Sequence, residues 1–447
     1  MRHPLPALLL GLASLLASGA SLARPLLLIS IDGLRPADVI DAQQRGMRLP
    51  NLQAFLTRGA YASDVRGVLP TLTYPSHTTM LTGVSPNLHG IGGNLTFDPY
   101  NKNQQGWDWY TSDIRVPTLW DAARAAGLST ANVHWPVSVG APVDWNLPQI
   151  WRTGSPDDRK LLAALATPGL LPSLEQGLGP YADGIDESLA GDQNRARFMV
   201  KLLQTRKPQF MTAYFAALDD KEHTSGPGTP AANRVLEGID ALVGELVAAA
   251  QRVHPDGVVA VVSDHGFASV QHDVNLYAPF IQAGLITFKD GAVTDWQAMP
   301  WNDGGSAAIV LRHPADAALQ AKVATLLKQL QHDPRYAIDK VLDHRQLVAA
   351  GGTAQASWFV LFKTGAEMGI KADAPPLTPG HYLGMHGYDP ALPAMRSTFL
   401  IAGAGIPAGR NLGSIDMRDI APTLAALMGV SLPQAQGYAL LPAAKPR

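Results

Sequence analysis

Acidic and histidine residues follow three apolar runs of this 447-residue sequence, at the point where each run ends. The residues that share this placement are Asp32 after 26–31, Asp219 and His223 after 210–218, and Asp264 and His265 after 258–263. His386 is a further histidine, in the loop-like segment 384–388. Where thiolates are absent, zinc takes nitrogen and oxygen ligands, and paired zinc ions stabilise both the attacking and the leaving oxygen of a phosphoryl transfer. Three carboxylates and three imidazoles therefore predict two zinc sites.

Each of these carboxylates taken alone has a simpler explanation. Aspartate is common in turns and at helix N-termini, and Asp32-Gly33 and Asp264-His265-Gly266 have the composition of ordinary turns. Three strand ends together are harder to explain in this way, because the carboxyl ends of parallel strands meet at one edge of a sheet. The spacing Asp219-x-x-x-His223 also places both side chains on one face if a helical turn begins there.

Thr73 is the candidate nucleophile, in the segment 69–83. As an isolated residue it would be a helix cap. Its hydroxyl becomes an effective nucleophile only when a metal ion or a base lowers its pKa. A helix predicted from about Ser76 would direct its positive amino end toward Thr73, which favours an anionic phosphoryl group there.

Continuous apolar runs are typical of strands that are buried on both faces of a parallel sheet. In this sequence they lie at 25–31, 210–218, 258–264 and 397–403. Helical patterns lie among them, at 51–58, 117–126, 194–203 and 231–253. The alternation predicts an α/β fold with a doubly wound, mostly parallel sheet, helices on both of its faces and functional residues at the carboxyl ends of its strands.

The segment 276–375 interrupts this alternation. It has a helical pattern at 316–331 and short apolar runs at 307–311 and 358–362, which predict a small inserted α+β subdomain. The catalytic domain would then consist of 24–275 and 376–447. The segment 97–113, rich in Asn, Gln, Gly and aromatic residues, is predicted to be a long surface loop.

Residues 1–23 have the pattern of a signal peptide, since an apolar stretch leads to Ser21-Leu22-Ala23, which fits a signal peptidase site. A retained N-terminal anchor is the alternative. We expect a periplasmic or secreted protein without a membrane span after signal removal. The absence of cysteine excludes disulfides, thiolate metal sites and a cysteine nucleophile. With 35 basic and 37 acidic residues and no long run of one sign, we expect no stable nucleic-acid binding, and we predict no protein partner.

A set of short motifs occurs in a fixed order along the chain. They are Ile31-Asp-Gly-Leu-Arg35, Pro70-Thr-Leu-Thr-Tyr-Pro-Ser-His77, His89-Gly-Ile-Gly-Gly-Asn94, Trp135-Pro136, Asp219-Asp-Lys-Glu-His223, Ser263-Asp-His-Gly266 and His386-Gly-Tyr388. With these motifs the chain resembles the nucleotide pyrophosphatase/phosphodiesterase family of the alkaline phosphatase superfamily, over about 26–428.

The resemblance implies a role for each motif residue. One zinc ion would be held by Asp219, His223 and His386, and the other by Asp32, Asp264 and His265. Thr73 would bridge the two ions and act as the nucleophile that forms a phosphothreonine intermediate. Asn94 would donate a hydrogen bond to a nonbridging phosphate oxygen. Tyr74 would pack against the leaving or retained group, and a purely structural core position is the equal alternative.

Two positions depart from the family pattern. The segment that usually resembles Pro-Asp-x-x-Gly-His is Leu218-Asp-Asp-Lys-Glu-His223 here, so Asp220 competes with Asp219, and the four-residue spacing favours Asp219. Ser76 stands where many members have Asn, which affects substrate contacts more than the metal ligands.

The predicted function is that of an exported zinc-dependent phosphodiesterase or nucleotide pyrophosphatase with a small phosphodiester or nucleotide substrate. A phosphomonoesterase or a phospholipase C-like enzyme on the same scaffold is the alternative, and a non-catalytic zinc-binding protein is a third. Monoesterases add a cationic group, and neither Arg35 nor Arg115 is supported in that role by its place in the sequence. Of the other histidines, we expect His77, His89 and His381 to support the ligands.

Overall fold

The structure, a computed structural model, describes residues 24–104 and 106–442. The expected signal peptide at 1–23 lies outside these residues. Among the helices that the structure describes, none combines the length and the apolar character that a bilayer crossing needs.

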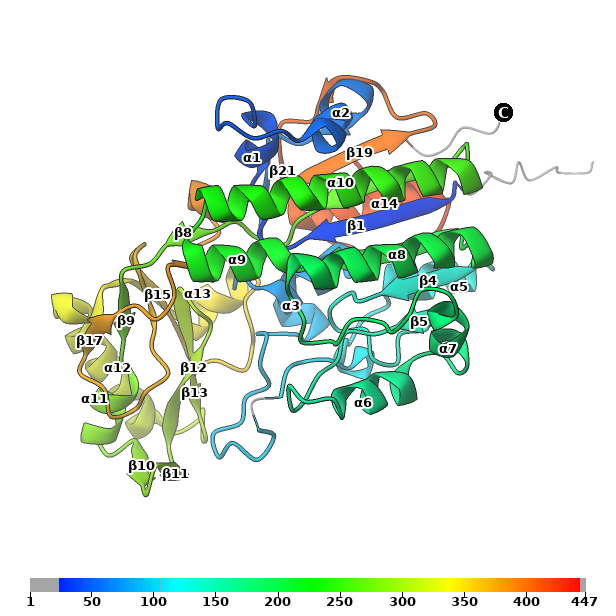
Figure 1. The fold of residues 1–447 in the computed structure, drawn as a ribbon. Helices are drawn as coiled ribbons and strands as arrows, with labels where there is room; N and C mark the ends of the chain where they lie inside the picture. Colours follow the sequence, from blue (N-terminus) through cyan, green and yellow to red (C-terminus); the bar gives the residue numbers. More distant parts are fainter. Residues whose placement is uncertain (1–23, 105, 443–447) are drawn as a thin grey trace, which may run out of the picture.

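A sheet of eight strands forms the centre of the molecule (Figure 1). In spatial order its strands are β20 (Arg410–Asn411), β2 (Ala60–Tyr61), β19 (Phe399–Gly403), β7 (Val258–Val262), β1 (Leu26–Ile31), β6 (Phe210–Phe215), β4 (Thr130–Val133) and β5 (Trp145–Leu147). The five strands from β7 to β5 run parallel, while β19 pairs antiparallel with β7. The carboxyl ends of β1, β6 and β7 therefore lie at one edge.

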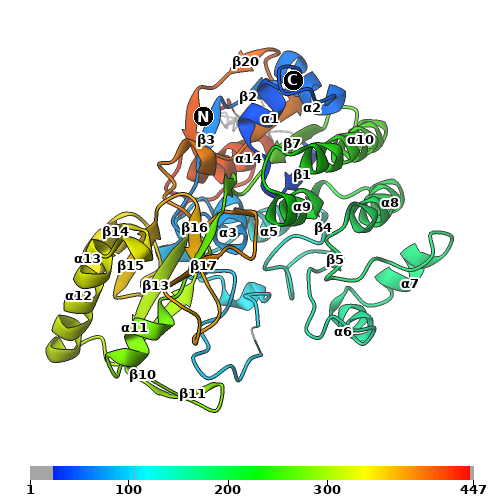
Figure 2. The same ribbon diagram turned by 60° about the vertical axis from the view of Figure 1, so that its left-hand side comes forward.

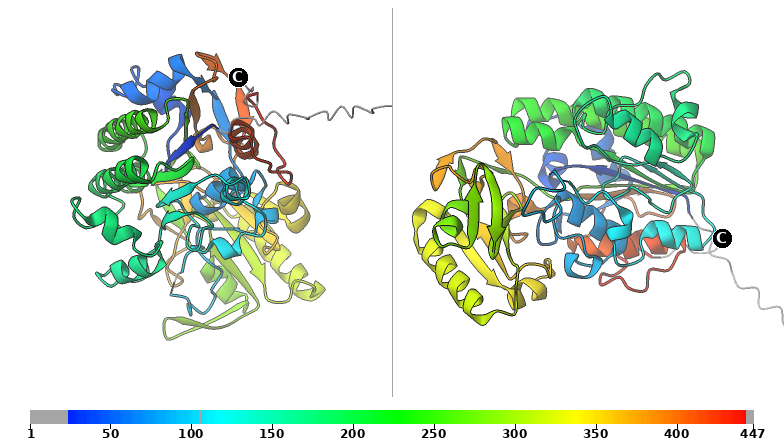
Figure 3. Two further views of the ribbon diagram at one scale, coloured as in Figure 1. Left: turned by 90° about the vertical axis from the view of Figure 1, so that its right-hand side faces the viewer. Right: turned by 90° about the horizontal axis from the view of Figure 1, so that it is seen from below.

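Helices cover both faces of this sheet, as the two views of Figure 3 show. One layer contains α2 (Pro50–Arg58), α8 (Leu189–Arg206) and α10 (Pro230–Val253), and the other contains α3 (Thr73–Thr82), α5 (Leu119–Ala125) and α14 (Ile420–Met428). Successive side chains of β1 enter opposite layers, because side chains alternate along a strand: Leu27 and Ile29 belong to the first core, and Leu26 and Leu28 to the second. The predicted doubly wound α/β fold is confirmed.

The apolar run 210–218 is not one strand, which corrects the prediction from sequence. Strand β6 ends at Phe215, and helix α9 (Ala217–Ser225) begins two residues later. The buried carboxylate of Asp192 accepts hydrogen bonds from the backbone N–H groups of Ala216 and Ala217, at 3.3 and 2.9 Å. These bonds satisfy backbone donors at the start of α9, where no helix carbonyl is available to accept them. Asp219 and His223 therefore lie on a helix and not in a loop.

The segment that interrupts the α/β pattern forms a second, antiparallel sheet (Figure 2). Its strands are, in spatial order, β12 (Ala298–Asn302), β13 (Ser306–Leu311), β15 (Trp358–Phe362) and β14 (Ile338–Asp343). The helices of this segment are α11 (Tyr277–Gln282), α12 (Ala317–His332) and α13 (His344–Ala349), and the hairpin β10 (Ile286–Lys289) and β11 (Ala292–Trp296) precedes the sheet. Their apolar side chains belong to a third core. The exact limits of an inserted subdomain, 276 and 375, stay a prediction.

Shorter elements connect these layers. The remaining helices are α1 (Pro36–Ile40), α4 (Pro86–His89), α6 (Asp158–Leu165) and α7 (Leu170–Glu175). The remaining strands are β3 (Asp64–Arg66), β8 (Ala268–Ser269), β9 (His272–Val274), β16 (Ala366–Met368), β17 (Leu377–Pro379), β18 (Gly384–Met385) and β21 (Ser414–Asp416). Within 97–113 the described residues form a short 3-10 turn, Thr111–Asp113, and two isolated bridges, from Trp107 to Leu95 and from Tyr110 to Val139, as expected for a long loop.

Candidate metal and phosphoester site

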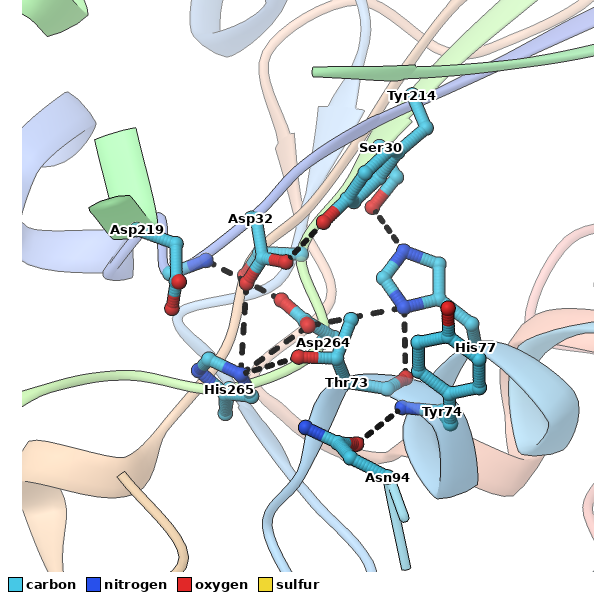
Figure 4. Close-up of polar contacts among 12 residues, drawn as sticks. Ser30, Asp32, Thr73, Tyr74, His77, Asn94, Tyr214, Asp219, Asp264 and His265 are labelled. Atoms are coloured by element: carbon cyan, nitrogen blue, oxygen red, sulfur yellow. Dashed lines mark hydrogen bonds and ion pairs between the residues drawn. The ribbon is translucent and has the colours of Figure 1, made fainter. Parts of the chain in front are cut away.

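Six predicted ligands come together beyond the carboxyl ends of β1, β6 and β7; Figure 4 shows four of them. The atoms that approach one another are the Nε2 atoms of three histidines and the oxygens of three aspartates. The distances are 3.4 Å for His265–Asp32, 3.2 Å for His265–Asp264, 3.3 Å for His223–Asp219 and 3.6 Å for His386–Asp219. The rings of His265 and His386 stack with their centroids 3.7 Å apart, which joins the two halves of the cluster.

Each imidazole is oriented through its other nitrogen. The Nδ1 atoms of His223, His265 and His386 lie 2.9, 3.2 and 3.1 Å from the carbonyl oxygens of Gly384, Gly266 and Thr71. A carbonyl only accepts, so Nδ1 carries the proton in all three rings and the neutral tautomer has its lone pair on Nε2. Each lone pair then faces a carboxylate oxygen, an arrangement that a cation between them stabilises and that is typical of metal-binding histidines.

The carboxylates also have the properties of metal ligands. One oxygen of each aspartate (Asp32 Oδ1, Asp219 Oδ1, Asp264 Oδ2) is buried and accepts no hydrogen bond from any residue that the structure describes. Burial raises the pKa of Asp264 to about 7, and burial together with the charge of Asp264 raises the pKa of Asp32 well above its ordinary value. Buried carboxyl groups of this kind are ionised readily only beside a positive charge, which a divalent metal supplies.

The pair Asp219–His223 behaves differently, because the charge of each partner stabilises the ionised form of the other. Burial favours the neutral imidazole, but the charge of Asp219 outweighs this effect and raises the pKa of His223 to about 9. Burial likewise opposes ionisation of Asp219, and the charges of His223 and His386 lower its pKa below the ordinary value. A metal ion bound here would displace the His223 proton.

The atom positions alone do not assign the six residues to two metal ions in the way that the resemblance implies. His265 Nε2 lies within 4.8 Å of ligand atoms in two groups, one with Asp219 and His386 and the other with Asp32 and Asp264. Asp219, and not its neighbour Asp220, is the carboxylate of the first group. The assignment of His265 to one ion stays a prediction.

Thr73 is the first residue of α3, whose N-terminal boundary lies at Leu72 and not near Ser76 as expected. Its side-chain oxygen lies 3.3 Å from His265 Nε2, and its exposed fraction is 6%. The unpaired N–H groups of the first helical turn make this end favourable for an anion. His77 Nδ1 lies 2.7 Å from the Thr73 carbonyl oxygen and His77 Nε2 2.8 Å from Ser30 Oγ, so the ring ties α3 to β1.

Asn94 faces the same helix end. Its Oδ1 accepts a hydrogen bond of 2.9 Å from the Tyr74 backbone N–H, which fixes the amide group and leaves Nδ2 to donate elsewhere. The Tyr74 hydroxyl donates to Gln149 Oε1 over 2.8 Å, and its ring belongs to the first core. Tyr74 is thus packed in the core and also lines a cavity, so its contact with a leaving or retained group stays a prediction.

A cavity of about 380 Å³ opens over this cluster. Thr73, Asp219 and His386 line it, together with the aromatic residues Trp107 and Trp151. No Lys or Arg is among the described residues that line it. Arg35 instead pairs with Asp38 and Glu222, at 2.8 and 3.1 Å, and Arg115 is exposed outside the cavity.

Several residues of this site were not found from sequence. Tyr214 donates a short hydrogen bond to Asp32 Oδ2, and Glu187, Glu367, Trp107 and Trp151 line the cavity. A tyrosine inside a buried strand was a usable signal, because a buried hydroxyl needs a partner. His77 lies beside the cluster, 3.6 Å from Asp264, as expected. His89 instead contacts Thr79, and His381 pairs with Asp273 at 2.9 Å.

The sheet, its helix layers and this edge define an alkaline phosphatase-like α/β protein. A family model described as type I phosphodiesterase/nucleotide pyrophosphatase matches residues 26–389, and the chain belongs to that family.

Curated relatives agree with this assignment. Ectonucleotide pyrophosphatase/phosphodiesterase family member 3 of Rattus norvegicus is 27% identical over 259 residues, which cover 56% of this chain and 25% of the relative. The Homo sapiens protein named bis(5'-adenosyl)-triphosphatase is 27% identical over 263 residues, covering 57% of this chain and 50% of the relative. The matched segment thus spans about a quarter to a half of these relatives' length.

Solved structures show the same fold. Human ectonucleotide pyrophosphatase/phosphodiesterase 5 superposes with a TM-score of 0.65 at 19% identity, covering 93% of this chain and 97% of that one. An inactive threonine-to-alanine variant of the murine protein, in complex with AMP, gives a TM-score of 0.66 at 17% identity over the same shares of the two chains.

Proposed function

We propose that this protein is an exported phosphodiesterase that depends on two zinc ions and uses Thr73 as its nucleophile. The orientation of the three imidazoles supports this proposal most. In each ring Nδ1 is bonded to a backbone carbonyl, so that three Nε2 lone pairs face buried carboxylates next to the Thr73 hydroxyl. The expected signal peptide supports export, as do relatives named as ectonucleotide enzymes.

The six side chains would hold the ions in the way that the resemblance implies. Asp219, His223 and His386 would bind one, and Asp32, Asp264 and His265 the other, beside the Thr73 hydroxyl. When bound, the two ions supply the positive charge that lowers the pKa of a hydroxyl and stabilises the oxygens of a phosphoryl group.

Thr73 would attack phosphorus in line, so that its Oγ1–P bond forms as the bond to the leaving oxygen breaks. Water then hydrolyses the phosphothreonine and restores the hydroxyl. The N–H groups at the start of α3 and Asn94 Nδ2 would donate to nonbridging oxygens. The rings of Tyr74, Trp107 and Trp151 would contact one ester group, since all three line the cavity.

The charges around the cavity favour a diester over a monoester. A monoester phosphate carries a second negative charge, and the described residues of the cavity wall offer no Lys or Arg to neutralise it. Glu187 and Glu367 add acidic groups to that wall. The murine relative with bound AMP and the human relative named as a dinucleoside triphosphatase make nucleotide esters and anhydrides reasonable substrates to include.

The test compares bis-p-nitrophenyl phosphate with p-nitrophenyl phosphate on the full chain, before and after removal of metal by a chelator. We expect kcat/KM for the diester to exceed that for the monoester at least tenfold. Chelation should lower the diester rate by roughly 10³-fold or more, because charge stabilisation is lost, and zinc should restore it. Metal analysis should find two zinc ions per active chain.

Three outcomes would contradict the proposal. Faster hydrolysis of the monoester would favour a phosphomonoesterase, and full activity after complete metal removal would exclude zinc dependence. A folded protein that contains two zinc ions but hydrolyses no activated ester would be a non-catalytic zinc-binding protein.

A further inference from the structure

Two carboxylates and an imidazole form a further cluster on a small sheet of three strands. Strands β16 and β17 flank β9 in this sheet and are seen in Figure 2. Asp273 lies on β9, Glu367 on β16, and His381 follows β17. One possible ligand atom from each residue lies within 4.8 Å of the other two. None of these residues is among the six predicted zinc ligands.

The two carboxylates are neighbours in the sheet. Asp273 and Glu367 pair directly across the parallel strands β9 and β16. Because side chains alternate along a strand, residues that pair in this way point to the same face of the sheet. Like charges at such neighbouring positions are destabilising. A cation bound between them would remove the repulsion.

Glu367 is the more deeply buried of the two. It is 1% exposed, and its Oε1 accepts no hydrogen bond from any residue that the structure describes. Burial, and after it the charge of Asp273, raises the pKa of Glu367 to about 8. A buried carboxyl oxygen without a hydrogen bond is costly, so this atom needs a proton or a cation beside it.

The imidazole of His381 faces both carboxylates. Its Nδ1 lies 2.9 Å from Asp273 Oδ2 and 3.5 Å from Glu367 Oε1. Ligands that are about 2.1 Å from a common metal ion lie roughly 3 Å apart, so these separations suit a shared ion, which would displace the Nδ1 proton. No Lys or Arg of the described chain forms an ion pair with either carboxylate.

The segment that begins at His381 supports a predicted zinc ligand. The Leu383 backbone N–H donates to the His223 carbonyl over 2.8 Å, and the Gly384 carbonyl orients the His223 ring. The ring of Tyr382 contacts both imidazoles, with its centroid 4.1 Å from that of His381 and 4.8 Å from that of His223. An ion bound by His381 would therefore anchor a segment on which the geometry of the zinc site depends.

The donor set indicates the kind of ion. Asp273 and His381 line a cavity of about 470 Å³ and are 15% and 39% exposed, so water can complete the coordination. Calcium takes about six to eight oxygen ligands, whereas two carboxylates and an imidazole suit a divalent transition-metal ion such as manganese or zinc.

We propose that Asp273, Glu367 and His381 bind a third divalent transition-metal ion, which fixes the segment 381–386 beside the predicted zinc site. This ion is additional to the two ions of the proposed reaction and shares no protein ligand with them. It binds more weakly than they do, because two of its three ligands are partly exposed to solvent. Dialysed protein therefore keeps two ions, and the third binds when metal is added.

The experiment titrates Mn²⁺ into zinc-loaded, dialysed full-length protein and measures the unbound ion by electron paramagnetic resonance. Sites of nitrogen and oxygen donors bind zinc more tightly than manganese, so both zinc ions should stay bound, which metal analysis of the same sample checks. We expect one bound Mn²⁺ per chain and a higher unfolding temperature in its presence. No binding up to on the order of 1 mM, the weak end of protein cation sites, would show that the carboxyl groups share a proton instead and would overturn the inference.

Two variants on β9 locate the bound ion. Asp273→Asn keeps the oxygen that accepts from the His381 backbone N–H and removes one charge, so it should weaken Mn²⁺ binding at least about tenfold and leave both zinc ions in place. His272→Gln is the matched control, because His272 is exposed and its side chain points to the other face of the sheet. It should bind Mn²⁺ as the wild type does. Equal Mn²⁺ binding by the wild type and Asp273→Asn would overturn the inference.

The role of His381 has a spectroscopic test. Electron spin echo measurements should detect a histidine nitrogen coupled to the bound Mn²⁺, and His381→Gln should remove this coupling together with most of the affinity. Because His381 is partly exposed, this variant also serves if Asp273→Asn does not fold. A nitrogen coupling that persists in His381→Gln would place Mn²⁺ at other histidines and contradict the proposed site.

The outcomes separate this inference from the proposed function. Mn²⁺ binding that depends on Asp273 in a protein that hydrolyses no diester would contradict only the phosphodiesterase function. Diester hydrolysis with two bound zinc ions and no Mn²⁺ binding would overturn only the third metal site.

Discussion

Buried carboxyl groups occur in two different environments in this molecule. At the edge of the central sheet, Asp32, Asp219 and Asp264 each have an oxygen within 3.6 Å of an imidazole nitrogen. In the second sheet, Asp303 follows β12 and is 2% exposed, and neither of its oxygens accepts a hydrogen bond from a residue that the structure describes. Burial raises the pKa of Asp303 well above its ordinary value.

The difference shows that burial by itself does not make a metal site. Desolvation alone favours the neutral carboxylic acid, as at Asp303. At the sheet edge, three imidazoles with their Nε2 lone pairs directed at the carboxylates add the nitrogen donors that zinc requires. Asp303 lines the same cavity as the metal cluster, but no imidazole of the described residues pairs with it. The chemistry therefore depends on which side chains β1, β7, α9 and the loop after β18 bring together.

The largest effect is expected for Thr73→Ala. This change should lower kcat for bis-p-nitrophenyl phosphate on the order of 10⁴-fold, because it removes the hydroxyl that is proposed to form the covalent intermediate, while zinc content stays near the wild-type value. Steady-state kinetics and metal analysis of the same preparation measure both quantities. Thr78→Ala is the control, since it removes a hydroxyl of the same helix that bonds the Tyr74 carbonyl. Near-native activity of Thr73→Ala would show that Thr73 is not the nucleophile.

Substitutions of Asn94 are expected to have an intermediate effect on kcat. They separate two roles of its side chain, as acceptor from the Tyr74 N–H and as donor to phosphate. Asn94→Ala removes both the acceptor for the Tyr74 N–H and the proposed donor to phosphate, and should lower kcat roughly 10²- to 10³-fold. Asn94→Asp keeps the acceptor and loses the donor, so its stability should stay closer to wild type while its kcat falls as far. Substantial activity in Asn94→Asp would show that Asn94 acts only by holding Tyr74. Thermal unfolding and kcat of the two variants decide between these roles.

The smallest effect is expected for Asp303→Asn, and it concerns stability. A carboxyl group whose pKa is raised on folding binds a proton in the folded state, so the free energy of unfolding falls as pH rises from about 4 toward the folded-state pKa. Asparagine does not titrate, so the variant lacks this decrease in the free energy of unfolding. The variant should therefore be more stable than wild type at pH 9, by about 1–3 kcal/mol, with a smaller difference at pH 5.

Denaturant unfolding at the two pH values measures this difference. Asp339→Asn, at an exposed position of β14, should show no such dependence on pH. Asp303 lines the cavity over the metal cluster, so a loss of activity greater than tenfold in Asp303→Asn would show that its carboxyl group takes part in the reaction.

The sequence by itself determined much of this protein. Continuous apolar runs predicted β1, β7 and β19, and periodic segments predicted α2, α5, α8, α10 and α12. The residue types and motif order identified all six side chains that converge at the sheet edge, together with Thr73 and Asn94. These features are local, because each depends on the residues beside it in the chain.

Other features were decided only by contacts between distant segments. Strands β4 and β5 carry buried Asn132 and Asn146, which bond each other at 2.8 Å. Because these polar side chains interrupt the apolar runs, a search for continuous apolar runs does not find the two strands. The end of β6 depends on Asp192, more than 20 residues earlier, and the hydrogen bond from Tyr214 to Asp32 joins two strands. Burial and hydrogen bonding between such segments exist only after the chain has folded, which is why the sequence identified the reacting groups and the tertiary structure decided their surroundings.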